Sequence, residues 1–233
     1  MPEPKLRVAE VFTSIQGEGI WAGTPSTFVR VSGCNLRCVW CDTPYASWSP
    51  EGPVMRVPDI AKQVEDAGVE HVVLTGGEPM LFDAIEPLAE GLKNSGHTIT
   101  IETAGTIFRD LPCDLMSISP KLSNSTPPED SGWEARHEQT RTNLDALSSL
   151  IAKYYIQLKF VVTPETAIDL AQIDALLNRL PSVRQDRILL MAEGIDSETQ
   201  HRRQRELAPI CVERGWRLSP RLHIDLFGNT RGT

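Results

Sequence analysis

The chain lacks the features that define several protein classes. None of its apolar runs approaches the roughly 20 residues needed to cross a bilayer, so no membrane insertion is expected. The segment Met1 to Lys5 lacks the basic start and apolar stretch of a secretory signal, which predicts a cytoplasmic protein. No internal repeat of solenoid spacing is present. Clustered Lys and Arg are also missing, and with a net charge of −8 no nucleic-acid binding is expected.

Cysteine is scarce and unevenly distributed. Three of the 5 cysteines, Cys34, Cys38 and Cys41, fall within one short segment. An odd number of crowded thiols suits an iron–sulfur cluster better than a disulfide scaffold. A [4Fe–4S] cube usually takes four cysteines, so three leave one iron open, as in reactive rather than structural metal centres. Cys113 and Cys211 lie far away and are interpreted as small buried apolar residues, with a fourth ligand from either disfavoured.

Length and composition are those of a globular protein. Hydrophobic residues make up 40% of the 233 positions and charged residues 23%, which is ordinary for a soluble chain. This length favours one large domain over two small ones. A single domain over residues 1–233 and a small-molecule substrate are therefore expected.

Strand-like and helix-like segments alternate after residue 50, which is the pattern of a parallel sheet built from βα units. Strands are expected at residues 8–12, 27–31, 71–74, 98–103, 115–119, 157–162, 188–191 and 216–218. Helices are expected at residues 58–67, 84–94, 139–152, 167–180 and 197–214. The polar stretch 123–137 is rich in turn residues and is expected to be a surface excursion rather than a domain linker.

Polar side chains recur on one face of three expected strands. Arg30, Glu102 and Lys159 each alternate with apolar neighbours. Side chains of a strand point alternately to its two faces, and a buried charge needs a partner or a ligand. For one strand alone a solvated face is an equally good interpretation, but the recurrence on three strands favours a lined cavity.

Short motifs follow several of these strands. Glycines in Thr75-Gly76-Gly77-Glu78-Pro79 and in Gln16-Gly17-Glu18-Gly19 would let the backbone approach a ligand, although each could simply be a turn that needs glycine. The lysine of Ser119-Pro120-Lys121 could reach a carboxylate or a ribose, or extend to solvent. Asp42-Thr43, directly after Cys41, offers oxygen ligands of the kind that Mg²⁺ prefers.

The cysteine spacing, with Trp40 just before Cys41, resembles the signature of the radical S-adenosylmethionine superfamily. The segment Gly76-Gly77-Glu78-Pro79 resembles the second motif of that superfamily. Together they imply a partial (βα)₆ TIM-like barrel of the radical SAM type, with a cluster-binding loop at about 32–48. The cluster would be a [4Fe–4S] cube whose open iron binds the amino and carboxylate groups of S-adenosylmethionine.

More of the chain resembles one family, the 7-carboxy-7-deazaguanine synthases. The similar segments are residues 15–19, 28–34, 41–43, 101–106, 117–121 and 222–229. The resemblance implies a carbon–nitrogen lyase that converts 6-carboxy-5,6,7,8-tetrahydropterin to 7-carboxy-7-deazaguanine with loss of ammonia, by hydrogen abstraction at C6 and ring contraction. This reaction belongs to queuosine and 7-deazapurine biosynthesis. A homodimer and an external electron donor such as a flavodoxin are also implied.

The same resemblance implies site residues by position. It places the cluster on Cys34, Cys38 and Cys41, and Mg²⁺ on Thr43. The residues that it places near S-adenosylmethionine are Trp40, Cys41, Asp42, Gly77, Glu102, Ser119, Pro120 and Lys121. Those that it places on the pterin are Ile15, Gln16, Gly17, Arg30, Thr75 and Lys159. No side chain is assigned as a catalytic acid or base.

Two other functions stay open at this point. An activase that places a glycyl radical on a partner protein has similar cysteine spacing, but it would need a docking face and no Mg²⁺ site centred on Thr43. The segments 16–19 and 119–121 argue against it. A non-catalytic zinc or iron–sulfur electron-transfer module belongs to a different class. Zinc would need a fourth ligand and would leave the protein colourless.

Overall fold

Nine strands form one sheet in the computed structural model, which describes residues 3–233. The strand order is β3-β1-β2-β4-β5-β6-β7-β8-β9. β1 pairs antiparallel with β2 and β3, whereas every pair from β2 to β9 is parallel. The strands are β1 (Lys5–Ile15), β2 (Pro25–Val31), β3 (Val54–Arg56), β4 (His71–Gly76), β5 (Thr98–Thr103), β6 (Leu115–Ile118), β7 (Ile156–Val162), β8 (Ile188–Ala192) and β9 (Arg217–Ser219).

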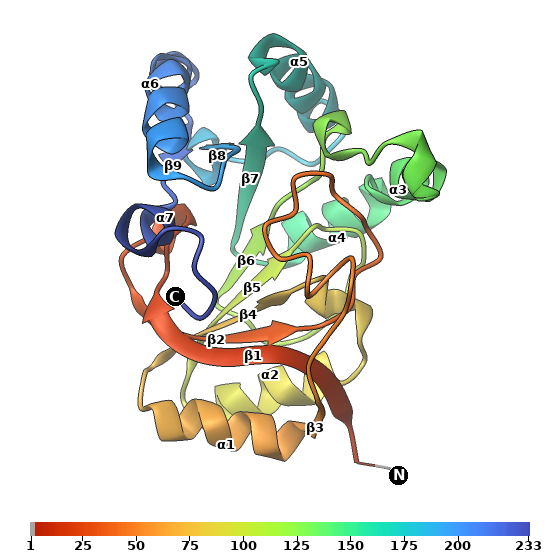
Figure 1. Ribbon diagram of the computed structural model, residues 1–233, viewed down its shortest axis with the longest axis vertical. Helices are drawn as coiled ribbons and strands as arrows, with labels where there is room; N and C mark the ends of the chain where they lie inside the picture. Colours follow the sequence, from red (N-terminus) through yellow and green to blue (C-terminus); the bar gives the residue numbers. More distant parts are fainter. Residues whose placement is uncertain (1–2) are drawn as a thin grey trace.

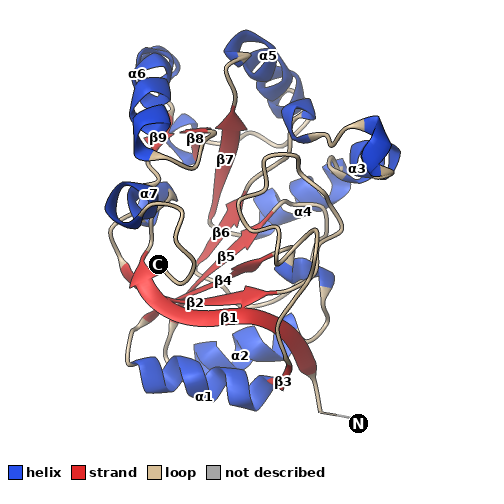
Figure 2. Cartoon of the chain, in the orientation of Figure 1, coloured by secondary structure: helices blue, strands red, loops and turns tan. Residues whose placement is uncertain are grey.

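In the described chain six helices connect successive strands and lie outside the curved sheet, and a seventh follows the last strand (Figure 1). They are α1 (Val57–Ala67), α2 (Ile85–Asn94), α3 (Glu134–Thr140), α4 (Leu144–Lys153), α5 (Thr166–Leu177), α6 (Ser197–Arg214) and α7 (Leu222–Phe227). Five 3₁₀ turns complete the described chain: Gly19–Trp21, Pro79–Leu81, Ser123–Ser125, Glu129–Ser131 and Gln185–Arg187. The cartoon in Figure 2 shows long loops and the C-terminal segment crossing the inner side of the sheet.

The sheet confirms the expected partial (βα)₆ barrel. The parallel strands β2, β4, β5, β6, β7 and β8 form its wall, and the sheet ends at β3 and β9 without closing. Strand residues that point outward, such as Val29, Leu74 and Ile101, are fully buried under the helices and form the main apolar core. Their alternating neighbours point inward. No helix within residues 3–233 has both the length and the apolar composition to cross a membrane.

All eight expected strands and five expected helices have counterparts, whereas α7 was not predicted, and three further differences have a physical reason. The three-residue strand β3 was not predicted, because it is too short to show a period. The helix expected at 139–152 is wrong in its first turn: α4 begins at Leu144, and the side chain of Asn143 caps it by accepting from the Ala146 amide at 3.1 Å. The stretch 123–137 is not a simple surface excursion, because it contains most of α3 and its His137 is 0% exposed.

Candidate active site

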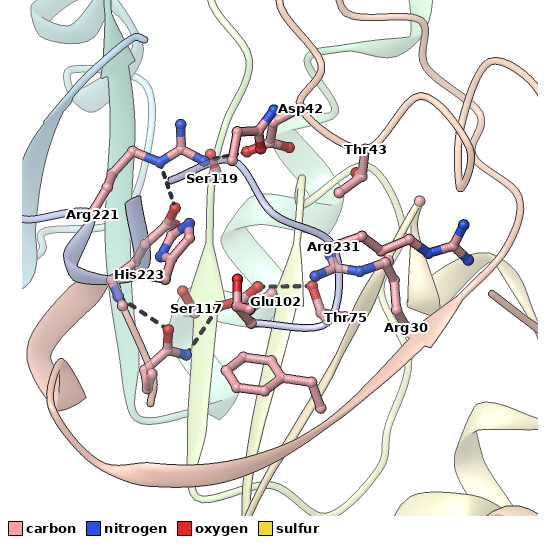
Figure 3. Close-up of a pocket in the computed structure, with 18 of the residues that line it drawn as sticks. Arg30, Asp42, Thr43, Thr75, Glu102, Ser117, Ser119, Arg221, His223 and Arg231 are labelled. Carbon is pink, nitrogen blue, oxygen red and sulfur yellow. Dashed lines mark hydrogen bonds and ion pairs between the residues drawn. The ribbon is translucent and has the colours of Figure 1, made fainter. Parts of the chain in front are cut away.

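A cavity of about 450 Å³ occupies the inner side of the sheet (Figure 3). Five strands each direct one polar side chain into it, because residues of alternate parity share the inner face. These side chains are Arg30 from β2, Thr75 from β4, Glu102 from β5, Ser117 from β6 and Lys159 from β7. The cavity therefore combines these polar groups with apolar lining residues such as Phe12, Phe28 and Met191.

The structure brings most of the expected site residues to this cavity. The lining includes Ile15, Gln16, Gly17, Arg30, Trp40, Asp42, Thr43, Thr75, Gly77, Glu102, Ser119, Lys121 and Lys159. Pro120 and the three cysteines of the cluster-binding loop do not line it. The cysteine side chains instead pack together with Leu36 and Ala104, in a small buried cluster that includes Trp40, itself part of the cavity wall.

The cysteine thiols lie where burial suppresses their ionisation. Burial raises the pKa of Cys34 to about 12, and Glu78 and the other two thiols add to the rise. Burial likewise raises the pKa of Cys38 to about 11. The Cys34 sulfur accepts the Leu36 amide at 3.3 Å, and the Cys41 sulfur lies 3.1 Å from Ser47 Oγ. Because thiolates are the metal ligands, iron binding here would release protons.

These residues fit a [4Fe–4S] cluster better than a single ion. No three His, Cys, Asp or Glu side chains within residues 3–233 are grouped closely enough to share one metal ion. A cube instead attaches each thiolate to a different iron. Ser32 Oγ, close to Cys34 in sequence, is a buried polar atom with no hydrogen-bond partner among the described residues, as expected beside a site that a bound group completes.

Gly77 fits the glycine turn tightly against the cluster-binding loop. A Cβ atom on Gly77 would lie 2.1 Å from the Gly33 carbonyl oxygen and 2.6 Å from that of Ala46. The Gly77 amide donates to Val31 O at 3.0 Å, and the Gly33 amide donates to Ala46 O at 2.7 Å. Glycine is therefore required here for close backbone approach, which joins the turn after β4 to both ends of the loop.

The carboxylate of Glu78 connects two segments of the backbone. It is fully buried, and it accepts from the Thr103 hydroxyl at 2.7 Å and from the Ala104 amide at 2.8 Å. Burial raises the pKa of Glu78, and these hydrogen bonds oppose that rise. The side chain thus ties the glycine turn to the end of β5.

Three residues expected near S-adenosylmethionine contact one another. Lys121 Nζ donates to Ser119 Oγ at 2.8 Å and lies 5.3 Å from the centre of the Trp40 ring. Trp40 Nε1 donates to Asn124 O at 2.9 Å. Glu102, also expected near this cofactor, accepts from Thr75 at 2.8 Å and from Gln16 at 3.2 Å. It therefore lies between residues expected to contact the pterin.

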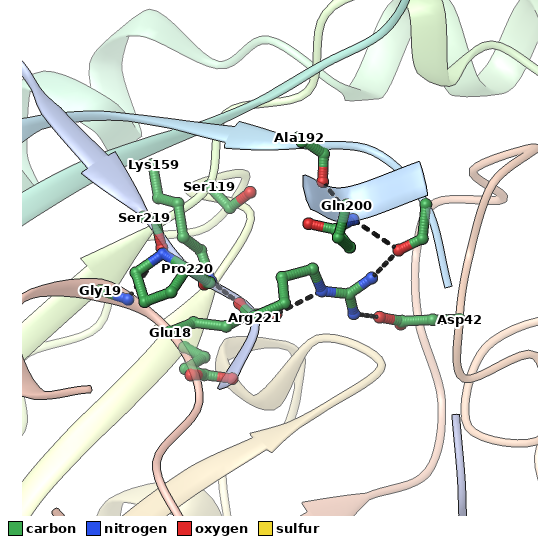
Figure 4. A network of polar contacts seen from close by, with 12 residues as sticks. Glu18, Gly19, Asp42, Ser119, Lys159, Ala192, Gln200, Ser219, Pro220 and Arg221 are labelled. Atoms are coloured by element: carbon green, nitrogen blue, oxygen red, sulfur yellow. Dashed lines mark hydrogen bonds and ion pairs between the residues drawn. The ribbon is translucent and has the colours of Figure 1, made fainter. Parts of the chain in front are cut away.

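A buried ion network joins four distant segments (Figure 4). The Glu18 carboxylate pairs with Lys159 Nζ and with Arg221 Nε, the latter at 3.0 Å. Arg221 also pairs with Asp42 and donates to Gly194 O at 2.7 Å. Burial alone would raise the pKa of Glu18, but Lys159 and Arg221 outweigh it and lower the pKa. The sequence analysis missed Arg221, because no local pattern shows that these partners converge on it.

Arg30 belongs to a second network at the cavity wall. Its Nε donates to Glu10 Oε1 at 2.6 Å, and Glu10 also accepts from Tyr45 at 2.8 Å. Arg231 lies 3.2 Å from Glu10 Oε2 and stacks on the Tyr45 ring at 4.2 Å. No acceptor within residues 3–233 engages the two terminal nitrogens of Arg30, which are left for a ligand. Glu10 and Arg231 were also missed by the sequence analysis.

His223 is a further lining residue that was not predicted. Burial lowers the pKa of its imidazole, so the ring is neutral at physiological pH. A Cβ on Gly17 would lie 1.9 Å from His223 Nδ1, and Leu222 donates to Gly17 O at 2.9 Å. The expected substrate loop therefore packs directly on the segment that begins α7. The similar segment 222–229 was the only sequence signal for this region.

Residues 28–148 match the Radical SAM superfamily. The crystal structure of QueE from Escherichia coli, 26% identical, has a TM-score of 0.72 and covers 92% of this chain and 93% of that chain. The structure of TYW1 with a lysine-pyruvate adduct bound, 16% identical with a TM-score of 0.56, shares the fold. The chain is a radical SAM protein, a class that uses a [4Fe–4S] cluster and S-adenosylmethionine.

Relatives similar over nearly the whole chain define the family more closely. The 7-carboxy-7-deazaguanine synthase of Halobacterium salinarum is 44% identical over 242 residues, covering 99% of this chain and 93% of the relative. That of Rhodopirellula baltica is 43% identical over 234 residues, covering 99% and 90%. The chain belongs to the 7-carboxy-7-deazaguanine synthase family. The activase alternative finds no support among these relatives.

Proposed function

We propose that this chain converts 6-carboxy-5,6,7,8-tetrahydropterin to 7-carboxy-7-deazaguanine with loss of ammonia, in queuosine and 7-deazapurine biosynthesis. Family membership supports the reaction. The observation that carries the proposal is the polar cavity beside the three-cysteine loop, where Arg30, Glu102 and Lys159 from separate strands face one chamber. An arrangement of this kind orients a polar heterocycle next to a redox centre.

Contacts in the cluster-binding loop support the cofactor positions that the family resemblance implies. Cys34, Cys38 and Cys41 would hold the cluster. Trp40, Asp42, Gly77, Glu102, Ser119 and Lys121 would line the S-adenosylmethionine site. Pro120 stands between the last two of these in the sequence. When bound, the reduced cluster and S-adenosylmethionine supply hydrogen-atom abstraction from the substrate. The chain's own residues orient the reactants and exclude competing reactions.

The pterin would contact Ile15, Gln16, Gly17, Arg30, Thr75 and Lys159, all of which line the cavity. The terminal nitrogens of Arg30 would bind the substrate carboxylate, because a planar guanidinium can engage two oxygens at once. Glu10 holds Arg30 Nε and so orients this fork. Lys159 is already paired with Glu18, so its role would be to hold the Glu18 loop or to exchange partners when substrate binds.

Mg²⁺ would bind at the Thr43 hydroxyl. Asp42, the other oxygen ligand that the sequence offered, is paired with Arg221 and is therefore less suited to the ion. The remaining ligands would come from the substrate and from water, as is usual for Mg²⁺ at sites that bind oxygen-rich substrates. The ion would orient substrate oxygens and stabilise developing charge.

The working form of the enzyme is also part of the proposal. Residues 1–233 would form one domain, in agreement with the single nine-stranded sheet. The enzyme would be a cytoplasmic homodimer that takes electrons from an external donor such as a flavodoxin. These assignments depend on the family resemblance.

The decisive experiment is anaerobic reconstitution of the cluster, followed by incubation with S-adenosylmethionine, reductant, Mg²⁺ and the carboxytetrahydropterin. Mass spectrometry should detect the deazaguanine product, with release of ammonia. A Cys38→Ala variant provides the cluster-free control. Production of 5′-deoxyadenosine without any deazaguanine would retain the radical SAM class and overturn the proposed substrate.

A further inference from the structure

The segment of residues 123–141, called the clasp below, packs against the cluster-binding loop at several points. The Arg37 amide donates to His137 Nδ1 at 3.1 Å, and the Val39 amide donates to Ser125 O at 2.9 Å. Both amides that flank Cys38 are therefore held by the clasp. Trp40 Nε1 also donates to a clasp residue, Asn124, as described above.

His137 makes two hydrogen bonds whose directions are determined by their partners. A backbone N–H can only donate, so Nδ1 accepts from Arg37 and the proton lies on Nε2. Nε2 lies 2.9 Å from Ser125 Oγ, which in turn donates to Leu122 O at 2.6 Å. The imidazole is 0% exposed, and this chain of bonds satisfies both of its nitrogens.

Arg37 strengthens the same contact from the loop side. The residue is 9% exposed, and its guanidinium donates to Cys34 O at 2.8 Å and to Leu36 O at 2.7 Å. It also lies 4.0 Å from the centre of the Trp133 ring, within the range of an attractive cation–π contact. The Arg37 guanidinium thus connects the carbonyls of the cluster-binding loop to Trp133 of the clasp.

The clasp is itself fixed to the barrel. Asn124 Nδ2 donates to Val161 O of β7 at 3.0 Å, and Arg141 donates to Lys121 O at 3.0 Å. The Ser123 amide donates to Gln172 Oε1 of α5 at 2.9 Å. A segment anchored to the wall of the barrel can hold the loop in a defined position.

We propose that the clasp sets the conformation of the cluster-binding loop, and that His137 is its positioning residue. His137 accepts a hydrogen bond from the Arg37 amide, and Ser125 O accepts one from the Val39 amide. These bonds orient Cys38 between the two amides and keep both amides from bonding to cluster sulfurs. Hydrogen bonds to those sulfurs tune the reduction potential, and the partners of metal ligands affect metal affinity by about 10- to 100-fold. His137 therefore acts on cluster retention and on its potential.

The test compares two substitutions that keep opposite halves of the imidazole. In His137→Asn the carboxamide oxygen lies near the position of Nδ1 and can still accept from Arg37. In His137→Gln the carboxamide reaches toward the Nε2 position and leaves the Arg37 amide unsatisfied. Iron loss to a chelator should be about tenfold faster in His137→Gln, with altered electron paramagnetic resonance of the reduced cluster, whereas His137→Asn should stay near the wild type.

Two controls keep the test decisive. His201→Gln changes an exposed histidine of α6 and should lose iron at the wild-type rate. If neither His137 variant folds, Trp133→Leu removes the clasp ring that the Arg37 guanidinium contacts and should also accelerate iron loss. Equal iron loss in His137→Asn and His137→Gln would show that the ring only fills space, and wild-type iron loss in His137→Gln, or in Trp133→Leu, would equally overturn the proposal.

The proposed role of the clasp rests on the cluster site of the proposed function, and it does not require the proposed substrate. Chelation and the resonance spectrum need no pterin, and unfolding of the iron-free variants reports the fold separately. An inactive wild-type enzyme that retains its cluster would therefore contradict the proposed reaction and leave the clasp intact.

Discussion

Arg221 Nε lies 3.0 Å from Glu18 Oε1, although 203 positions separate the two residues in the chain. Arg221→Gln should lower the free energy of unfolding of the iron-free protein by about 3 kcal/mol, the lower end for a broken buried ion pair, because Lys159 still neutralises Glu18. Urea denaturation measures this loss. Arg184→Gln, which breaks an exposed pair with Asp186, should change stability by less than about 0.5 kcal/mol. If Arg221→Gln loses no more stability than Arg184→Gln, the buried ion network does not stabilise the fold.

Arg30→Ala tests the proposed carboxylate site. Loss of a charge-assisted pair of hydrogen bonds costs about 1.5–3 kcal/mol, so KM for the pterin should rise about 10- to 100-fold. Iron content should not change, because Arg30 is not among the residues packed around the cysteines. Steady-state kinetics and iron analysis provide the two measurements. A colourless, iron-free Arg30→Ala protein would contradict this role, and Arg56→Ala, which changes an exposed arginine, is the matched control.

Gly77→Ala tests the contact between the glycine turn and the loop. The new methyl group would meet the Gly33 and Ala46 carbonyls, so the free energy of unfolding should fall by about 1–3 kcal/mol and iron should be bound less tightly. Gly91→Ala in α2 is the control, because a Cβ there meets nothing within 4 Å. It should stabilise the protein by about 0.5–1 kcal/mol. Wild-type iron binding by Gly77→Ala would contradict the close fit.

The free energy of unfolding should decrease as the pH is lowered, because His137 becomes protonated. The pKa of this imidazole is lowered from 6.5 to about 4, mainly by burial; Arg141 and Lys121 contribute to this shift and Glu138 opposes it. Between these two values the unfolded chain binds the proton and the folded protein does not. The stabilisation is therefore complete above about pH 6.5 and is lost as the pH falls to about 4.

Urea unfolding of the iron-free protein across this pH range measures the effect. His137→Gln should show a shallower decline than the wild type, since other groups titrate equally in both proteins. Parallel curves for the two proteins would mean that His137 is not buried neutral.

Cys113 and Cys211 are not expected to bind iron. Cys211 is buried in the main core and Cys113 packs against it, apart from the cluster formed around Cys38. A Cys113→Ala, Cys211→Ala double variant should therefore reconstitute with as much iron as the wild type. Cys38→Ala should not retain the cluster. Loss of iron from the double variant would require a fourth protein ligand.

The sheet was largely predictable because its strands are short apolar runs between helical segments. The run His71 to Leu74 predicts a buried strand by itself, and β4 indeed covers it. The clasp was harder to predict, since Pro127 and Pro128 mask the short helix that follows. No apolar period marks α3, whose one buried residue is His137.

Some residues of the candidate site could be predicted from the sequence, and others could not. Residues at the carboxyl ends of strands, such as Thr75 in β4 and Ser119 after β6, could be placed by the rule that parallel sheets gather ligands there. Arg221 and Glu10 could not be placed, because their surroundings come from segments that are remote in sequence. A buried charge is recognisable only with its partners present.

The loop of residues 16–19, called the Gln16 loop, contacts residues 219–222 at the end of β9 and the start of α7. These contacts also determine when the site can form. Gly19 donates to Ser219 Oγ across 200 positions, and Leu222 donates to Gly17 O. Strands β1, β2 and β4 can pair, and Gln16 can reach Glu102, while later residues are still being synthesised. Gly17 and Gly19 gain these two partners only after β9 and the start of α7 have emerged. Contacts of such high sequence separation form late, so the catalytic chamber is expected to be the last part of the nascent chain to become ordered.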